Sequence, residues 1–219
     1  DESDINAVSC VLRSPNVTGG PVVEEFEQEL ATYAKAEAAT VFSSGTSALC
    51  AGMHDVWKGE YDNGKHRNRV ITTPLSFVAT TNSILSTGLT PVFVDVEHET
   101  LCLSPWQVLS KLDRNVCAVL SVDFSGSPVN YSALSKLCQA ADVSFISDAA
   151  HSFGGNVSGV PIGSSTLSDI TTTSFHPVKT ITTGEGGAVF SKTTTKRRLV
   201  AFRDHGRMGG VATYVSYNH

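Results

Sequence analysis

The sequence lacks several features that would assign the protein to a specialised class. No apolar run is long enough to span a bilayer, and the first ten residues show no basic segment followed by an apolar one, so we expect neither a membrane anchor nor a signal peptide. The 16 basic and 21 acidic residues give a formal net charge of -5 and leave no basic cluster suited to nucleic acid or an anionic membrane. We therefore expect no nucleic-acid or membrane partner.

Cysteine is scarce, and its spacing matches no metal site or disulfide framework. The cysteines are odd in number and contain no Cys-X-X-Cys pair; the five are Cys10, Cys50, Cys102, Cys117 and Cys138. They are typical of reduced, mostly buried cysteines in a cytoplasmic protein, and we expect no metal ion. The 219 residues are 41% hydrophobic and 17% charged, which is sufficient for one large domain with a sizeable core.

Strand-like and helix-like segments alternate along the chain. Helices are predicted over residues 21–33, 48–57, 76–86, 104–112, 131–141 and 193–203. Seven apolar runs are predicted as strands, over residues 38–42, 69–73, 91–96, 116–124, 143–146, 169–175 and 188–191. The alternation predicts an α/β fold, a three-layer αβα arrangement around a mostly parallel seven-stranded sheet. The apolar strands read as buried on both faces, as such a sheet requires.

A single lysine stands out because of its surroundings. Lys179 lies between the apolar run 170–175 and a turn that contains Gly184, Gly186 and Gly187. Where water is scarce the ammonium form of a lysine is disfavoured, so its amine is available as a nucleophile, which is what a Schiff-base lysine requires. An ordinary loop lysine is the alternative, and this residue needs partners before it can be assigned a role.

An acid follows one of the predicted buried strands. Asp148 comes just after the strand over 143–146, and a carboxylate there is costly unless it is paired. A protonated pyridine nitrogen is one candidate partner, and capping of the next turn is the alternative. His151 lies three residues further on, where it either contacts the same ligand or satisfies the local backbone.

A short polar loop connects the first predicted strand to a helix. In this loop Gly45 allows a tight turn, while Thr46 and Ser47 place hydroxyl and N–H groups at the helix start, where the helix dipole favours an anion. Simple helix capping is the alternative. The loop has neither a Gly-Lys-Ser/Thr ending nor a Gly-X-Gly-X-X-Gly pattern, so nucleotide binding of those kinds is not supported. Ser174 is a second candidate phosphate contact, or an ordinary strand-end serine.

The order of these features is more informative than any one of them. Phe77, after the strand over 69–73, either covers a flat aromatic ligand or belongs to the core. A phosphate loop, a stacking ring, an acid at a strand end and a lysine before a glycine turn match the phosphate, ring face, ring nitrogen and aldehyde of pyridoxal phosphate. The sequence therefore predicts a pyridoxal phosphate site beyond the carboxyl ends of the strands.

The sequence resembles the DegT/DnrJ/StrS nucleotide-sugar aminotransferases, whose fold is the type I fold of aspartate aminotransferase. The resemblance covers nearly the whole chain, and it rests on SSGTSAL, SDAAHSFGG, SFHPVKTITTGEGGAV and FRDHG among other stretches. It implies that Lys179 binds the cofactor aldehyde and later moves the proton, and that Asp148 pairs with the pyridinium nitrogen. It also implies that Phe77 stacks on the ring and that His151 lies near the phenolic oxygen.

The same resemblance implies how the phosphate is held. Gly45, Thr46, Ser47 and Ser174 would bind it within one subunit. Members of the family are homodimers with a shared active site, and the partner subunit supplies an asparagine to the phosphate. Asn218, in TYVSYNH, stands at the matching place, although the residues around it depart from the family pattern.

Two stretches indicate a substrate class. VLSVDFSGSPVNYSALSKLC and ITTPLSFVATTNSIL are most similar to the C4 aminotransferases of the pseudaminic acid pathway. That resemblance implies transfer of an amino group from L-glutamate to the C4 ketone of a nucleotide-linked, UDP-type, 4-keto-6-deoxy sugar. A dehydratase of the same fold, which has histidine where Lys179 stands, and an inactive cofactor-binding fragment are the alternatives. Residues 1–219 would form an N-terminal segment and the large cofactor-binding domain, without the smaller C-terminal domain of the family.

Overall fold

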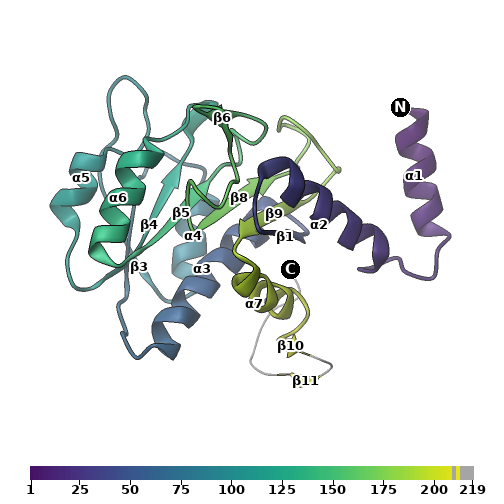
Figure 1. Cartoon of the computed structure of the whole chain (residues 1–219), viewed down its shortest axis with the longest axis horizontal. Helices are drawn as coiled ribbons and strands as arrows, with labels where there is room; N and C mark the ends of the chain where they lie inside the picture. Colours follow the sequence, from purple (N-terminus) through teal and green to yellow (C-terminus); the bar gives the residue numbers. More distant parts are fainter. Residues whose placement is uncertain (209–210, 213–219) are drawn as a thin grey trace.

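Seven strands form one sheet at the centre of the protein (Figure 1). The computed structural model describes residues 1–208 and 211–212. In spatial order the strands are β1 (Ala38–Phe42), β9 (Gly187–Ser191), β8 (Ile170–Ser174), β5 (Ser144–Asp148), β4 (Val116–Val122), β2 (Arg69–Thr72) and β3 (Thr90–Phe93). β9 is antiparallel to β1 and to β8, whereas the other neighbouring pairs are parallel. The predicted seven-stranded, mostly parallel sheet is confirmed.

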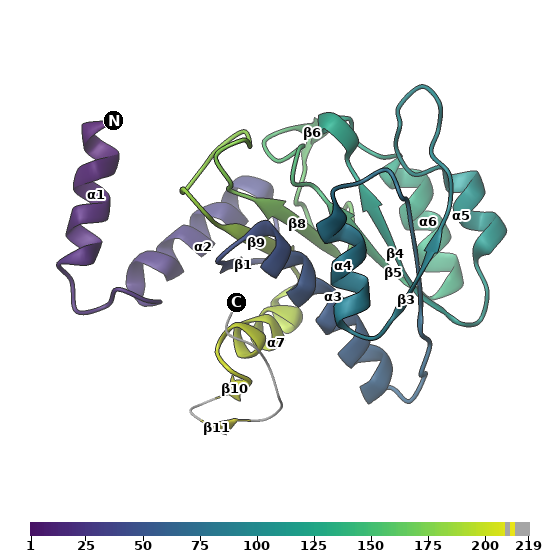
Figure 2. The same ribbon diagram turned by 180° about the vertical axis from the view of Figure 1, so that it is seen from behind.

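Helices cover both faces of this sheet. One face packs against α3 (Gly45–Asp62), α4 (Val78–Ser86) and α7 (Thr193–Arg203), as Figure 2 shows for α3 and α4. The other face packs against α2 (Pro21–Ala34), α5 (Pro105–Lys111) and α6 (Tyr131–Ala141). The three-layer arrangement is therefore confirmed, and it explains why every residue of β4 is buried.

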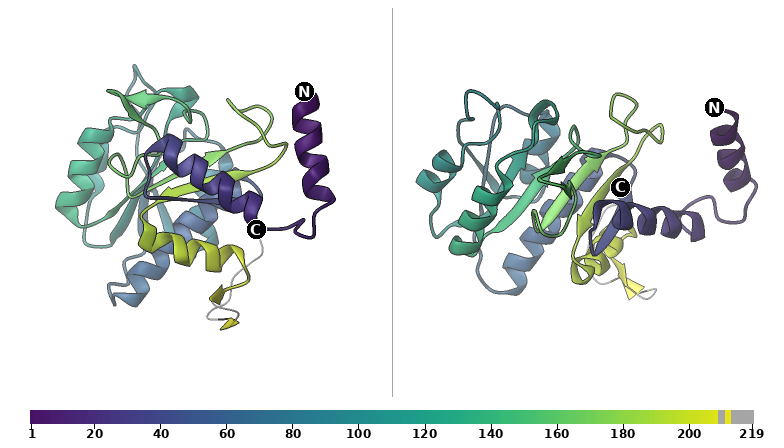
Figure 3. Two further views of the ribbon diagram at one scale, coloured as in Figure 1. Left: turned by 45° about the vertical axis from the view of Figure 1, so that its right-hand side comes forward. Right: turned by 45° about the horizontal axis from the view of Figure 1, so that its top comes forward.

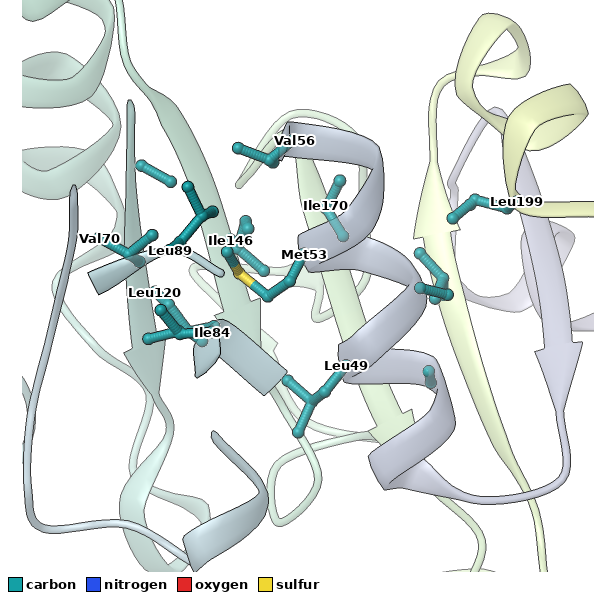
Figure 4. Packing of buried hydrophobic residues seen from close by; sticks show 14 of the residues in the cluster. Leu49, Met53, Val56, Val70, Ile84, Leu89, Leu120, Ile146, Ile170 and Leu199 are labelled. Carbon is teal, nitrogen blue, oxygen red and sulfur yellow. The ribbon is translucent and has the colours of Figure 1, made fainter. Parts of the chain in front are cut away.

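The longest helix, α3, supplies much of the core. Leu49, Met53 and Val56 follow one another at spacings of four and three residues, so they share one face of the helix. Figure 4 shows that face lying against Ile146 of β5 and Ile170 of β8. This packing places the start of α3, at Gly45, near the carboxyl ends of β5 and β8.

Some elements differ from the sequence predictions. The strand over 91–96 is shorter and spans Thr90–Phe93, and the strand over 116–124 ends at Val122. It ends there because Phe124–Gly126 turns as a short 3-10 helix after Asp123. The helix expected from residue 76 begins at Val78, since Phe77 caps it in an extended conformation.

Apart from the 3-10 helix, five elements of the described residues were not predicted. α1 (Glu2–Leu12) lies away from the sheet and buries none of its side chains (Figure 3). The others are two-residue strands that pair as hairpins, namely β6 (Asn156–Val157) with β7 (Val160–Pro161) and β10 (Arg207–Met208) with β11 (Val211–Ala212). Within the described residues, no helix has the length and apolar character needed to cross a membrane.

Candidate active site

A cavity of about 540 Å³ lies beyond the carboxyl ends of β4, β5 and β8. Its walls come from the loops that follow β1, β2, β5 and β8, so residues far apart in the sequence meet there. The sequence-predicted residues that line it are Gly45, Thr46, Phe77, Asp148, His151, Ser174 and Lys179. The fold thus brings together most of the proposed site.

One predicted residue, Ser47, does not line this cavity. Ser47 is buried, and its hydroxyl lies 3.0 Å from the hydroxyl of Ser44 and 3.3 Å from that of Ser43. Its backbone N–H donates to the Ser44 hydroxyl, so the structure shows it in the capping arrangement that the sequence left as an alternative. Asn218 lies outside the described residues, and its role stays a prediction.

Asp148, the last residue of β5, is buried at 6% exposure. One carboxylate oxygen accepts a hydrogen bond from the Thr80 hydroxyl at 2.8 Å, and the other accepts from the Ala150 backbone N–H at 3.2 Å. Burial raises the pKa of Asp148, while these two donors and the nearby charges of His151 and Lys179 act in the opposite direction. No lysine or arginine among the described residues forms an ion pair with it, which leaves the carboxylate facing the cavity without a full cationic partner.

Lys179 approaches the same space from the loop after β8. Its backbone N–H donates to the carbonyl of His176 at 2.9 Å, and its side chain is half-buried on the cavity wall. The Lys179 charge lowers the pKa of both Asp148 and His151. For His151 burial is the larger cause, and it favours the neutral imidazole. An amine, an acid and an imidazole therefore face one cavity.

Close backbone contacts shape the cavity wall at the start of α3. A Cβ atom added to Gly45 would lie 2.7 Å from the Cβ of Ser174, and one added to Gly187 would lie 2.5 Å from the carbonyl oxygen of Ser44. Only residues without a side chain allow the start of α3 to come this close to β8 and β9. The free N–H groups of a helix start, with the hydroxyls of Thr46 and Ser174 beside them, form a suitable anion site.

Phe77 lies on the wall of the cavity rather than in the core. It precedes α4, and 72% of its side chain is exposed. An aromatic ring of this exposure at the cavity mouth is placed to stack on a flat ligand. The alternative that it belongs to the core does not fit its exposure.

Two buried residues that form hydrogen bonds with Asp148 were not predicted from the sequence. Thr80 is fully buried and donates to Asp148, as described above. Its position three residues after Phe77 in a helical pattern is the one indication that the sequence offers. Asp123, also fully buried, was included in a predicted strand without any role. An acid that interrupts the apolar run VCAVLSVDF is the signal that identifies it.

A second cavity, of about 560 Å³, lies at the opposite edge of the sheet near the starts of β5 and β8. Its acids already have basic partners, since Asp55 pairs with Arg198 and Glu60 pairs with Arg67. The carboxyl-end cavity, with its buried acid lacking a cation, is therefore the better candidate for an active site.

Comparison with known proteins agrees with this geometry. The sequence profile of the DegT/DnrJ/EryC1/StrS aminotransferase family matches residues 1–218. The UDP-4-amino-4,6-dideoxy-N-acetyl-beta-L-altrosamine transaminase of Helicobacter pylori is 34% identical over 209 residues, which cover 95% of this chain and 54% of that protein. The chain belongs to the DegT/DnrJ/EryC1/StrS aminotransferase family.

Solved structures extend this likeness to the fold. The structure of Helicobacter pylori PseC, an aminotransferase involved in the biosynthesis of pseudoaminic acid, matches with a TM-score of 0.91 and 32% identity, over 100% of this chain and 58% of that one. NtdA from Bacillus subtilis, solved with bound cofactor PMP, matches with a TM-score of 0.86 and 25% identity, over 99% of this chain and 48% of that one. The chain spans about half the length of the curated relatives that it matches.

Proposed function

We propose that this chain is the cofactor-binding part of a pyridoxal phosphate-dependent nucleotide-sugar aminotransferase. The observation that carries the proposal is the shared cavity of Lys179 and Asp148, which come from different strand ends and face the same space. Residues 1–219 would correspond to the N-terminal segment and large domain of the full enzyme. Its five cysteines are all free, which supports a reduced, cytoplasmic location.

The residues of the cavity fit pyridoxal phosphate. The start of α3, with Thr46 and Ser174, would hold the phosphate, because the glycine contacts keep that corner open to an anion. Asp148, buried without a cationic partner, would bind the protonated ring nitrogen. Phe77 would cover one ring face, and Lys179 would bind the aldehyde carbon.

When bound, the cofactor supplies an electron sink for negative charge that develops at a substrate carbon. Asp148 keeps the ring nitrogen protonated, because a buried carboxylate beside it favours the cation. When its amine is free, Lys179 would move one proton at the α-carbon of the amino donor, as general base and then as general acid. His151, whose pKa is lowered by partial desolvation and by the charge of Lys179, would lie near the phenolic oxygen.

The substrate class is proposed from the relatives. Transaminases from Helicobacter pylori and Campylobacter jejuni that match this chain are named for a UDP-linked 4-amino-4,6-dideoxy sugar. We therefore propose that L-glutamate donates the amino group and that the acceptor is the C4 ketone of a UDP-linked 4-keto-6-deoxy-N-acetylhexosamine. The site would be completed by a second copy of the chain, whose Asn218 would reach the phosphate. Lysine rather than histidine at position 179 disfavours the dehydratase alternative.

The proposal is tested with purified protein and added pyridoxal phosphate. We expect the bound cofactor to give a visible absorption band and borohydride reduction to attach it to the peptide that contains Lys179. The Lys179→Ala variant should retain the fold and lose that attachment. Absence of cofactor uptake by the wild-type protein would contradict the assignment. Assay of the full-length gene product with a panel of keto-sugar nucleotides then tests the substrate.

A further inference from the structure

A second buried acid lies next to Asp148, at the end of the neighbouring strand. Asp123 follows β4, and its backbone N–H donates to the backbone carbonyl of Asp148 at 3.1 Å. This bond continues the parallel pairing of β4 with β5, in which Val122 lies opposite Asp148. Asp123 is completely buried, and its side chain does not line the cavity. It therefore approaches the site only through its neighbours.

Hydrogen-bond donors surround the Asp123 carboxyl group. One oxygen accepts from the backbone N–H of Val129 at 3.0 Å. The other accepts from the hydroxyl of Tyr131 at 2.7 Å and from the hydroxyl of Ser152 at 2.5 Å. Among the described residues no lysine, arginine or histidine forms an ion pair with Asp123. Three donors stabilise the ionised carboxylate, which would otherwise be unfavourable in this buried position.

The same contacts connect Asp123 to β5 and to the turn that follows it. The Tyr131 hydroxyl lies 2.7 Å from the hydroxyl of Ser147, the residue before Asp148. Ser152 belongs to the turn that also carries Ala150, whose N–H donates to Asp148. Hence the carboxyl groups of the two acids share one hydrogen-bonded frame and are held in fixed relative positions.

The two acids also interact electrostatically, although burial is the main cause of the raised pKa of Asp123. Burial raises the pKa of Asp123, and the charge of Asp148 raises it further. The other titratable groups that face Asp123 are Tyr131 and Cys102; burial raises the pKa of each, and the charge of Asp123 adds to that, so both remain neutral. The cations of the site, among them Lys179, lie near Asp148. Asp123 therefore has no cationic partner of its own among the described residues.

We propose that Asp123 is a positioning residue of the cofactor site, whose charge behind Asp148 stabilises a protonated pyridine nitrogen in front of it. The inference rests on the proposed function, because it requires that Asp148 bind that nitrogen. Asp123 makes no contact with the ligand and acts through Asp148. Two aligned carboxylates hold a cation more strongly than one, provided that the second stays ionised.

Asp123→Asn tests the charge with little change of shape. The Asn amide nitrogen can donate to the hydroxyl oxygens of Tyr131 and Ser152, and the amide oxygen can still accept from Val129. The measurement is the pH midpoint of the absorption change of the protein-bound cofactor, with the cofactor dissociation constant determined by fluorescence. We expect the midpoint to fall by about one pH unit, and cofactor binding above that midpoint to weaken about tenfold.

Ser121→Ala is the matched control, because the hydroxyl of this buried β4 residue donates to the Ile146 carbonyl and not to Asp123, so the change removes a buried hydrogen bond and leaves the donors and the charge of Asp123 in place. Its midpoint should stay within error of the wild type. In the Asp148→Asn background, Asp123→Asn should shift the midpoint less than half as far. If Asp123→Asn does not fold, Tyr131→Phe replaces it; the loss of one donor makes Asp123 harder to ionise, so the midpoint should move the same way.

The outcomes are distinct from those that test the proposed function. If the wild-type protein does not bind pyridoxal phosphate, the proposed function fails. If it binds and the Asp123→Asn midpoint equals that of the wild type, or if Ser121→Ala produces an equal shift, then Asp123 does not act through its charge and the inference is overturned.

Discussion

Gly187→Ala is expected to damage the phosphate end of the site through one backbone contact. Gly187 begins β9, where it lies opposite Phe42 of β1 and Ser174 of β8. A methyl group there would lie 2.5 Å from the Ser44 carbonyl oxygen and 2.6 Å from the Gly45 nitrogen. Optimal contacts between such atoms are about 3.5–4.0 Å, so the strand or the helix start has to move by roughly 1 Å.

The expected cost follows from how little can move. The obstructing atoms belong to the backbone, and both flanking strands are paired, so no side chain can rotate away. Overpacking of this kind costs about 1–3 kcal/mol. For a chain of this length that corresponds to a fall in Tm of roughly 2–12 °C. The displacement also separates Gly45 from Ser174, and we expect cofactor binding to weaken by about tenfold.

Gly59→Ala is the matched control in the same protein. Gly59 is within α3 and has no atom within 4 Å of the added methyl, so alanine should raise stability by up to about 1 kcal/mol. Thermal unfolding and cofactor titration of both variants provide the comparison. If Gly187→Ala unfolds at the wild-type temperature and binds the cofactor with wild-type affinity, the close approach is not a constraint and the geometry of the phosphate end is wrong.

Two further predictions concern the buried acids. Thr80→Val removes the hydroxyl that donates to Asp148 and keeps the shape of the side chain, so the pKa of Asp148 should rise further. A hydrogen bond to a charged group contributes about 1.5–3 kcal/mol, so we expect the affinity for the cofactor to fall by roughly tenfold or more. Titration of the cofactor followed by absorbance measures this change. Burial raises the folded-state pKa values of Asp123 and Asp148 above their ordinary value of 3.8, so in the cofactor-free protein they bind more protons folded than unfolded. Their contribution to the free energy of unfolding should then fall as the pH rises from about 4 through those raised pKa values, and Asp123→Asn should flatten this slope in denaturant titrations; an unchanged slope would contradict it.

Much of the fold was predictable because its strands are apolar runs buried on both faces. A run such as residues 116–122, in which every residue is apolar or small, predicts a strand covered on both faces. Segments long enough to form helices separate such runs along the chain, which predicts the helices that cover the sheet. The direction of β9 was not predictable, since an apolar run has the same composition in either orientation. α1 was missed for another reason: it buries no side chain, so no core pattern marks it within the described chain.

The site was predictable where a residue type and a strand end coincide. Asp148 and Lys179 follow apolar runs, and their chemistry is unusual at such positions. The loop at the start of α3 shows the limit of this reasoning, because the sequence does not say which of its serines caps the helix: the structure shows that the Ser44 hydroxyl accepts from the Ser47 N–H. Thr80 and Asp123 contact Asp148 only because of the packing of α4 and the register of β4 with β5. Such residues are found from coordinates.

The reversed direction of β9 has a mechanical consequence for Lys179. Because β8 and β9 are antiparallel neighbours, the segment between them leaves and re-enters the sheet at the same edge, beside the cavity. The Phe175 N–H donates to the Gly186 carbonyl at 2.8 Å, so the loop that carries Lys179 is closed by a hydrogen bond where it joins the two strands. In the proposed reaction, rotation of the lysine side chain alone would therefore be enough to move its amine, while β8 and β9 stay in place.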